Sequence, residues 1–254
     1  MSLRLLKPLR LILPMLLAAG LFSGCFSSKN SKNISRGTIE ALPPAFLTGP
    51  AAALLTNAGG FRAHVVVSND LRMAKPVSGE LFVRDGKLLF AAEPEKKNAG
   101  GAFLFVSDLS NRQGFVWSEA LQGYAPLTLN VWPTNLVNQQ NASGLQRFEG
   151  HVCQSAEAVV QMSDGSQARF QLMRALDLNR IPIHISSISN ASGFSLTFSK
   201  IQPAAPPADV FTPPTDFTKY NSPEMMVTEL IMRQHNLRRR PGSTSEPVYD
   251  RSQK

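Results

Sequence analysis

Residues 79–90 read GELFVRDGKLLF and carry the clearest fold signal in the chain. An Asp-Gly pair between two apolar runs favours a two-residue β-hairpin turn, because both turn residues need positive φ and this pair tolerates it. The segment therefore predicts one strand at 79–84 and a second at 87–92, paired antiparallel across Asp85-Gly86.

Strand patterns continue on both sides of this hairpin, separated by turns rich in Asp, Asn, Gly and Ser. The further ranges are 62–68, 102–107, 114–117, 148–154, 158–162, 168–175, 183–188 and 194–201. Residues 127–140 have a weaker pattern, and a helix is expected there after Pro133. Strands in close succession predict a mainly β (α+β) fold, in which a curled antiparallel sheet of about ten strands forms an incomplete β-barrel.

Two helices are expected to accompany the sheet. The first spans 50–57. The second, at 222–237, begins with Ser222-Pro223-Glu224, which supplies an N-cap, a proline in the first turn and an acid near the positive end of the helix dipole. Its apolar stripe and the arginines expected at its far end are Met226, Val227, Leu230 and Ile231, followed by Arg238, Arg239 and Arg240.

The positive charge of the chain lies at its two ends. The net charge is +8, yet residues 37–237 contain 15 Lys or Arg against 16 Asp or Glu, which is a net of −1. A nucleic-acid-binding protein carries a basic face on the fold itself, so we expect no nucleic-acid partner. Short basic flanks suit the surface of an anionic membrane better.

The N-terminus has the composition of a secretory signal. Three basic residues in 1–10 precede the apolar run 11–22, LILPMLLAAGLF, and small residues follow it. The run is shorter than the roughly 20 apolar residues that span a bilayer. The alternatives are an uncleaved anchor helix and ordinary signal cleavage nearby, in which Cys25 has no part.

Residues 22–25 read FSGC and resemble the lipobox of bacterial lipoproteins, with Phe22 at a position that is usually Leu or Val. The resemblance implies cleavage after Gly24, a diacylglyceryl group on the Cys25 thiol and a further acyl group, such as palmitate, on the new amine. Phe26 is not the Asp that signals retention at an inner membrane, which implies an outer membrane facing the periplasm. Two or more acyl chains hold a protein on a bilayer, at about 0.8 kcal/mol per buried methylene.

The order of the β motifs resembles the lipoprotein-localisation superfamily, the LolA/LolB-like fold, and a related periplasmic family of unknown function. The motifs that carry the resemblance, within about residues 55–220, are 79–83 with 86–90, 115–117 with 123–124, 174–178 with 181–185, and 209–220. The resemblance implies an incomplete antiparallel barrel around helices, which encloses an apolar cavity. Two departures are the lack of a clear match to the exposed apolar loop by which membrane-anchored members deliver cargo, and the extra helix at 222–237.

The apolar strand residues form a candidate ligand cavity, although any one of them is as well explained by packing against helices. The candidates are Phe82, Leu88, Phe90, Phe103, Phe105, Phe115, Trp117, Phe170, Leu172, Phe194, Leu196 and Phe198. The predicted organisation is a signal peptide at 1–24, a flexible tether at 25–37, a LolA-like half-barrel domain with its C-terminal helix at 38–237, and a disordered basic tail at 238–254.

Catalytic signals are weak. The four histidines are scattered, and no nucleophile motif or phosphate loop is present. His151 and Cys153 share a strand face at an i, i+2 spacing, but neither a metal site nor a nucleophile can be completed from the residues around them. We expect no enzyme activity, no cofactor and no metal.

The sequence thus favours a membrane-anchored envelope lipoprotein that binds or carries a lipid or a lipoprotein acyl chain in an apolar half-barrel cavity. The alternative is a structural or assembly lipoprotein that binds an envelope protein, and a hydrolase is the weakest hypothesis.

Replacing Cys25 by Ser should abolish lipid attachment, because only the thiol accepts the diacylglyceryl group in the lipoprotein family. The expected result is an unprocessed or soluble chain instead of one in the membrane fraction, measured by fractionation and by the mass of the mature N-terminus. Unchanged cleavage together with retention at the membrane would contradict the anchor.

Overall fold

The computed structural model describes residues 43–69, 75–93, 103–129, 131–188, 194–234, 237–239 and 247–249. The predicted signal peptide and tether, with Gly24 and Cys25, lie outside the described residues.

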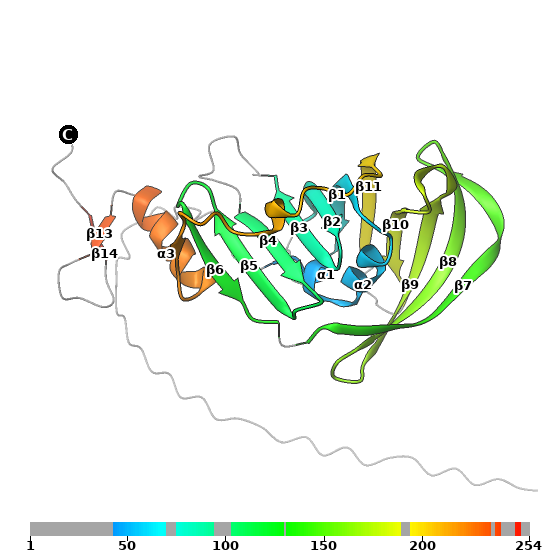
Figure 1. The fold of residues 1–254 in the computed structure, drawn as a ribbon, viewed down its shortest axis with the longest axis horizontal. Coiled ribbons are helices and arrows are strands. Elements are labelled where there is room, and N and C mark those ends of the chain that lie inside the picture. Colours follow the sequence, from blue (N-terminus) through cyan, green and yellow to red (C-terminus); the bar gives the residue numbers. More distant parts are fainter. Residues whose placement is uncertain are drawn as a thin grey trace, which may run out of the picture. The chain divides into compact units, whose positions relative to one another are not determined.

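A single curled and unclosed sheet dominates the described chain (Figure 1). Its strands are β1 Phe61–Ser68, β2 Val77–Arg84, β3 Lys87–Ala92, β4 Phe103–Asp108, β5 Gln113–Ser118, β6 Gly123–Leu127, β7 Pro133–Phe148, β8 His151–Met162, β9 Gln167–Ala175, β10 Pro182–Ser187, β11 Ser195–Gln202 and β12 Thr218–Lys219. The order across the sheet is β12-β6-β5-β4-β3-β2-β1-β11-β10-β9-β8-β7. All neighbours pair antiparallel except β12 and β6, which are parallel. The predicted fold class is confirmed.

The β2–β3 hairpin has the predicted geometry. Asp85 and Gly86 have φ of 48° and 79°, and Arg84 lies opposite Lys87. Two successive positive φ values are typical of the tight turn whose twist matches that of the flanking strands.

The prediction of a helix after Pro133 is wrong, because that segment forms the strand β7. It pairs with β8 along most of its length, with register shifts that leave some residues unpaired. The strands predicted at 148–154 and 158–162 are a single strand, β8, and the turn before it falls at Glu149-Gly150, where both φ values are positive. Pairing with a long neighbour decided the structure of this segment, since its own Asn- and Gln-rich sequence has little preference.

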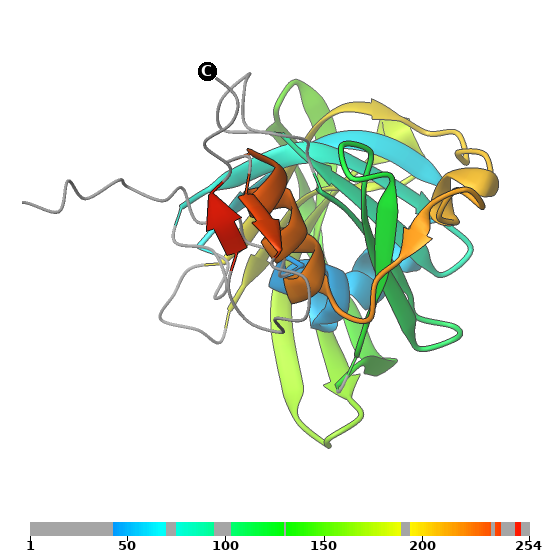
Figure 2. The same cartoon turned by 90° about the vertical axis from the view of Figure 1, so that its left-hand side faces the viewer.

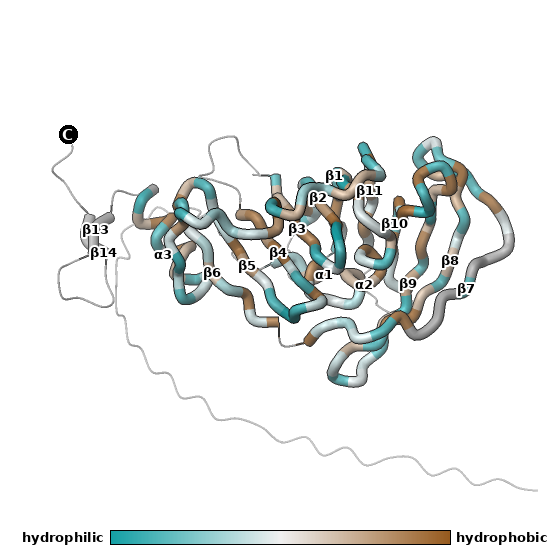
Figure 3. The backbone as a smooth tube through the Cα atoms, viewed as in Figure 1, coloured by the Kyte–Doolittle hydropathy of each residue, from teal (hydrophilic) through white to brown (hydrophobic). Residues whose placement is uncertain are grey.

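Two short helices, α1 Ala45–Thr48 and α2 Pro50–Thr56, pack on one face of the sheet, which we call the inner face. Strand residues alternate between this face and the opposite, outer face, as the alternating burial along β1 shows. The hydropathy of successive residues also varies along the strands (Figure 3). The predicted helix at 50–57 is confirmed as α2, whereas α1 was not predicted.

The segment 203–234 wraps around the β6 edge of the sheet. It first crosses the outer face, where η2 (Asp209–Phe211) buries Phe211 against β3, β4 and β5. The backbone N–H of Tyr220 then donates to Tyr124 O at 2.7 Å, as the chain passes along β6 through β12. The helix α3, Pro223–Gln234, finally packs on the inner face. This path covers one exposed edge, which limits pairing with other chains.

The C-terminal helix begins as predicted, with the Met225 N–H donating to Ser222 Oγ at 3.4 Å. It ends at Gln234, and Arg238 and Arg239 lie instead in β13 (Leu237–Arg239), which pairs with β14 (Pro247–Tyr249) within the predicted tail. Figure 2 shows this small sheet beside α3. No described helix has the length and apolar character needed to cross a membrane.

Replacing Gly86 by Ala should lower the free energy of unfolding by more than the same change at Gly150. Both glycines have positive φ, which costs a side-chain-bearing residue about 1–2 kcal/mol, but a Cβ at Gly86 would also meet Ser110 Oγ. Nothing lies within 4 Å of a Cβ built on Gly150. Urea unfolding of the two variants tests the difference, and equal losses would contradict the close packing of the turn.

Candidate functional site

The twelve residues proposed for an apolar cavity divide between the two faces of the sheet. Eight are buried in the inner core and Phe194 packs against it: Leu88, Phe90, Phe103, Phe105, Phe170, Leu172, Leu196 and Phe198. The other three, Phe82, Phe115 and Trp117, belong to the outer cluster with Phe211. Placing them in the cavity was therefore wrong. Alternation explains this, since Phe82 lies opposite Leu89 while its neighbour Leu81 lies opposite Phe90.

Side chains of the two short helices occupy the middle of the inner face. The Phe46 ring meets Phe90 edge-on, with centroids 5.4 Å apart, and on the sheet Phe61 meets Phe198 at 6.4 Å. The helix residues buried in this core are Phe46, Leu47, Ala51, Ala52, Ala53, Leu54 and Leu55. The interior of the half-barrel is therefore filled by the chain itself in this conformation.

The helix α3 closes the β6 end of the same core. Met226 and Leu230 are buried in it and Val227 packs against it, as predicted. Ile231 is 37% exposed, so its assignment to the apolar stripe was wrong.

The side chains on the inner face change from apolar to polar at the opposite end of the sheet. Along β8 and β9 the paired rows run from Ala158–Phe170 to Ala156–Leu172 and then to Gln154–Arg174. Beyond them lies Val152, which is 39% exposed. The apolar surface thus gives way to a cationic end that the sequence analysis did not single out.

Burial and the nearby charge of Arg180 both lower the pKa of Arg174. Arg180 follows η1 (Leu176–Leu178), and both it and Asn179 have positive φ, 60° and 54°. Such conformations cost a non-glycine residue on the order of 1–3 kcal/mol, and six other non-glycine residues in the described ranges also have positive φ.

A group of polar side chains that contact one another lies on the outer face, over β1, β2 and β11. His64 Nε2 is 3.3 Å from Glu93 Oε1, and Ser199 Oγ is 3.4 Å from His64 Nδ1. The Ser78 hydroxyl donates to Glu93 and is the main cause of the lowered pKa of that carboxyl. The contact between serine and histidine is longer than an ordinary hydrogen bond from a hydroxyl, so it provides little activation of a nucleophile.

Cys153 and His151 do not form a reactive pair. Cys153 is fully buried, and burial raises the pKa of its thiol, which leaves little of the nucleophilic thiolate. The His151 ring instead meets Asp177, Nδ1 to Oδ2 at 2.8 Å, and this contact lowers the pKa of Asp177. Across the described ranges, no three His, Cys, Asp or Glu side chains converge as a metal site would require.

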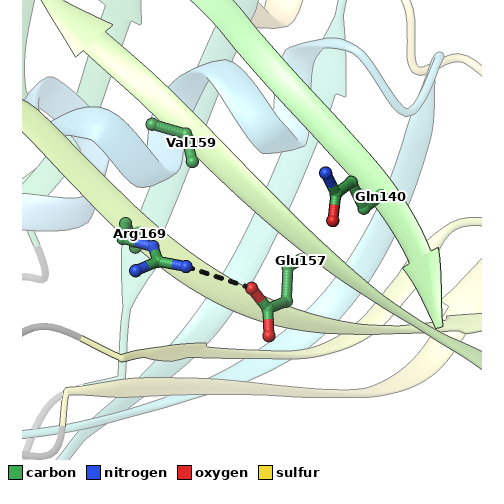
Figure 4. A pocket seen from close by; sticks show the side chains of 4 residues that line it. All are labelled: Gln140, Glu157, Val159 and Arg169. Carbon is green, nitrogen blue, oxygen red and sulfur yellow. Dashed lines mark hydrogen bonds and ion pairs between the residues drawn. The ribbon is translucent and has the colours of Figure 1, made fainter.

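A small polar hollow lies on the outer face of β7, β8 and β9 (Figure 4). Its walls are Gln140, Glu157, Val159 and Arg169, and Arg169 Nη2 is 3.4 Å from Glu157 Oε2. Its volume of ≈ 70 Å³ is well below the roughly 300–1,000 Å³ of typical ligand sites. It cannot hold a lipid.

No protein-family model matches the chain, and no curated protein sequence matches it. Among solved structures it is similar to a LolA superfamily protein from Nitrosomonas europaea, with 11% identity and a TM-score of 0.39, over 67% of this chain and 98% of that one. It is also similar to the lipoprotein LppX of Mycobacterium tuberculosis, with 14% identity and a TM-score of 0.34, over 61% and 96% of the two chains.

A third similar structure is PNGF-II, with 10% identity and a TM-score of 0.36, over 69% of this chain. The match spans only 33% of PNGF-II. All three TM-scores are below 0.5, so these similarities assign neither a family nor an activity to this chain.

Cys153 should react with iodoacetamide far more slowly in the native protein than in concentrated urea, because its thiol is buried and its pKa is raised. A matched control, Val152→Cys combined with Cys153→Ser, places a thiol at the partly exposed neighbouring position and should react readily. Both are compared in a Cys25→Ser background. Rapid labelling of native Cys153 would contradict its burial.

Proposed function

We propose that the protein is a non-enzymatic lipoprotein of the bacterial envelope, anchored through Cys25 to the periplasmic side of the outer membrane, which binds a lipid or acyl chain in its half-barrel. The observation that carries the binding role is the apolar inner face of an unclosed sheet, whose middle is covered by α1 and α2. Anchoring is supported by the lipobox-like residues 22–25 and the basic flanks.

The two covering helices depend on packing for their structure. They have four and seven residues, and neither has a side-chain hydrogen bond at its N-cap. Isolated helices of this length are marginal in water, so α1 and α2 have little stability apart from their contacts with the sheet. Gly49 separates them. A ligand that offers the sheet an equivalent apolar surface can therefore compete with them.

Burial of the helix side chains and burial of an acyl chain on the inner face would contribute free energies of similar size. Exposing Phe46, Leu47, Leu54 and Leu55 would cost about 6–12 kcal/mol, at about 1.5–3 kcal/mol for each large apolar side chain. Burying a sixteen-carbon acyl chain would gain about 12 kcal/mol, at about 0.8 kcal/mol per methylene. One long chain is thus enough to compete with the helices, and a lipid with two chains would favour displacement.

A protein-binding role is the second candidate, and the filled interior favours it. If the helices stay in place, binding must use the outer face, a free edge of the sheet or α3, where Met225 and Ile231 are exposed. Exposed apolar side chains on a surface helix are a common element of partner recognition.

Enlarging the interior should increase lipid uptake. Phe46→Ala removes a ring from the inner core, whereas Phe211→Ala removes a ring of equal size from the outer cluster and is the matched control. Both changes should destabilise the fold by about 3–5 kcal/mol, but only Phe46→Ala should raise the amount of bound lipid. The measurement is mass spectrometry of organic extracts of the purified proteins.

Failure to find lipid in the wild type and in Phe46→Ala, with neither taking up a fluorescent fatty acid, would contradict the binding role. Equal uptake by Phe46→Ala and Phe211→Ala would show that loosening of the fold, not the inner face, admits the ligand.

A further inference from the structure

The two edges of the large sheet differ in how they are covered. At one edge, β12 pairs with β6, and α3 packs on the inner face beside that strand. At the other edge lies β7, and no strand among the described residues pairs with its far side (Figure 1). An edge strand presents backbone N–H and C=O groups that can pair with a further strand. The sheet can therefore be extended by an added strand at β7.

The last four residues of β7 form its longest regular approach to the turn. Register shifts interrupt the pairing of β7 with β8 at three places before Leu145, whereas residues 145–148 pair with β8 without interruption. A two-residue turn, Glu149-Gly150, follows and fixes this register. We call residues 145–148 the β7 edge. In an antiparallel pair every second residue directs its N–H and C=O away from its partner, so the β7 edge offers these groups to an added strand.

Packing on the outer face holds the β7 edge in position. The Phe148 ring centroid lies 5.3 Å from that of His184, and Phe148 packs against the buried cluster that contains Cys153 and Ile183. The β7 edge is thus ordered before any partner arrives. Binding to an ordered strand costs less conformational entropy than binding to a segment that must first become ordered.

The inner-face side chains beside this edge are partly apolar. Leu145 lies opposite Gln154, and Arg147 lies opposite Val152, so Leu145 and Val152 are diagonal neighbours on one face. Leu145 is 65% exposed and Val152 is 39% exposed. An apolar side chain of an added strand would lie beside Leu145 and shield it from water.

The charge of β7 favours an acidic partner over a second copy of the chain. Arg147 is the only charged residue in 133–148. It is exposed, and the ion pairs among the described residues do not involve it. Pairing the β7 edges of two copies would bring the two Arg147 side chains near each other, with no acid in either strand to offset the repulsion. Opposite charges on neighbouring strands are favourable.

We propose that the β7 edge binds an extended segment of another protein as an additional strand of the sheet, with an apolar residue beside Leu145 and an acidic residue beside Arg147. In this mode of recognition, main-chain hydrogen bonds supply affinity and alternate side chains supply specificity. The inference goes beyond the lipid-binding function and does not depend on it, because α1 and α2 keep their places on the inner face.

The probe is an eight-residue peptide with blocked ends, in which threonine alternates with valine and glutamate in turn. A matched peptide has lysine in place of glutamate. Binding to the mature chain carrying Cys25→Ser is measured by fluorescence anisotropy, and the glutamate peptide should bind more tightly. Arg147→Glu should weaken the glutamate peptide and tighten the lysine peptide, by roughly fivefold in each direction. An unfolded variant could not show the gain.

Lys219→Glu is the matched control, because Lys219 is exposed in β12 at the opposite edge and undergoes the same change of charge. It should leave both affinities unchanged. Equal effects of Lys219→Glu and Arg147→Glu would overturn the inference, since they would reflect the net charge of the chain and not the β7 edge. Equal binding of the two peptides by the wild type would overturn it as well.

Two methylated forms of the glutamate peptide test the main-chain pairing. One carries N-methyl groups on the threonines, and the other carries them on the valines and glutamates. Every second N–H of an added strand points toward β7, so one form alone should lose binding. Loss of binding by both forms, or by neither, would contradict strand addition.

Sedimentation of the same chain distinguishes a second copy as the occupant. The expected result is a monomer, and dimers that the glutamate peptide dissociates would overturn the inference in favour of self-pairing. A chain that takes up lipid but binds neither peptide would contradict this inference alone and leave the lipid-binding function intact.

Discussion

A sheet of this size that does not close on itself has an apolar face that must be shielded from water. The positions of the other described elements follow from how this face is covered. The short helices α1 and α2 cover the middle of the inner face, and α3 covers the end at β6. The outer face is covered where η2 and its flanking segment cross β3, β4 and β5, and a second buried cluster on that face contains Cys153, Ala175 and Ile183. Hydrophobic burial is therefore concentrated between the sheet and two helices that have little stability of their own.

In this arrangement, binding of a ligand would displace the helices α1 and α2 that cover the inner face and would leave the sheet in place. The strands are joined by long antiparallel ladders, whereas α1 and α2 pack on the inner face through apolar side chains.

Much of the fold could be predicted from local patterns. The Asp85-Gly86 hairpin, α2 and the start of α3 agree with prediction because each depends on residues adjacent in sequence. The prediction failed at β7, whose Asn- and Gln-rich sequence acquires its structure from pairing with β8. It failed also for Phe82, Phe115 and Trp117, since a run of consecutive apolar residues does not reveal which alternate set faces the core.

Strand positions, turn chemistry and the lipobox-like N-terminus are properties of the amino-acid sequence, because they depend on contacts and conformations within a few residues. Which strand face forms the core, and that Leu145, Val152, Gln154 and Arg174 share one face, depends on the register between distant strands. Register is set by the simultaneous burial of many side chains, so only the folded sheet assigns those residues to one surface.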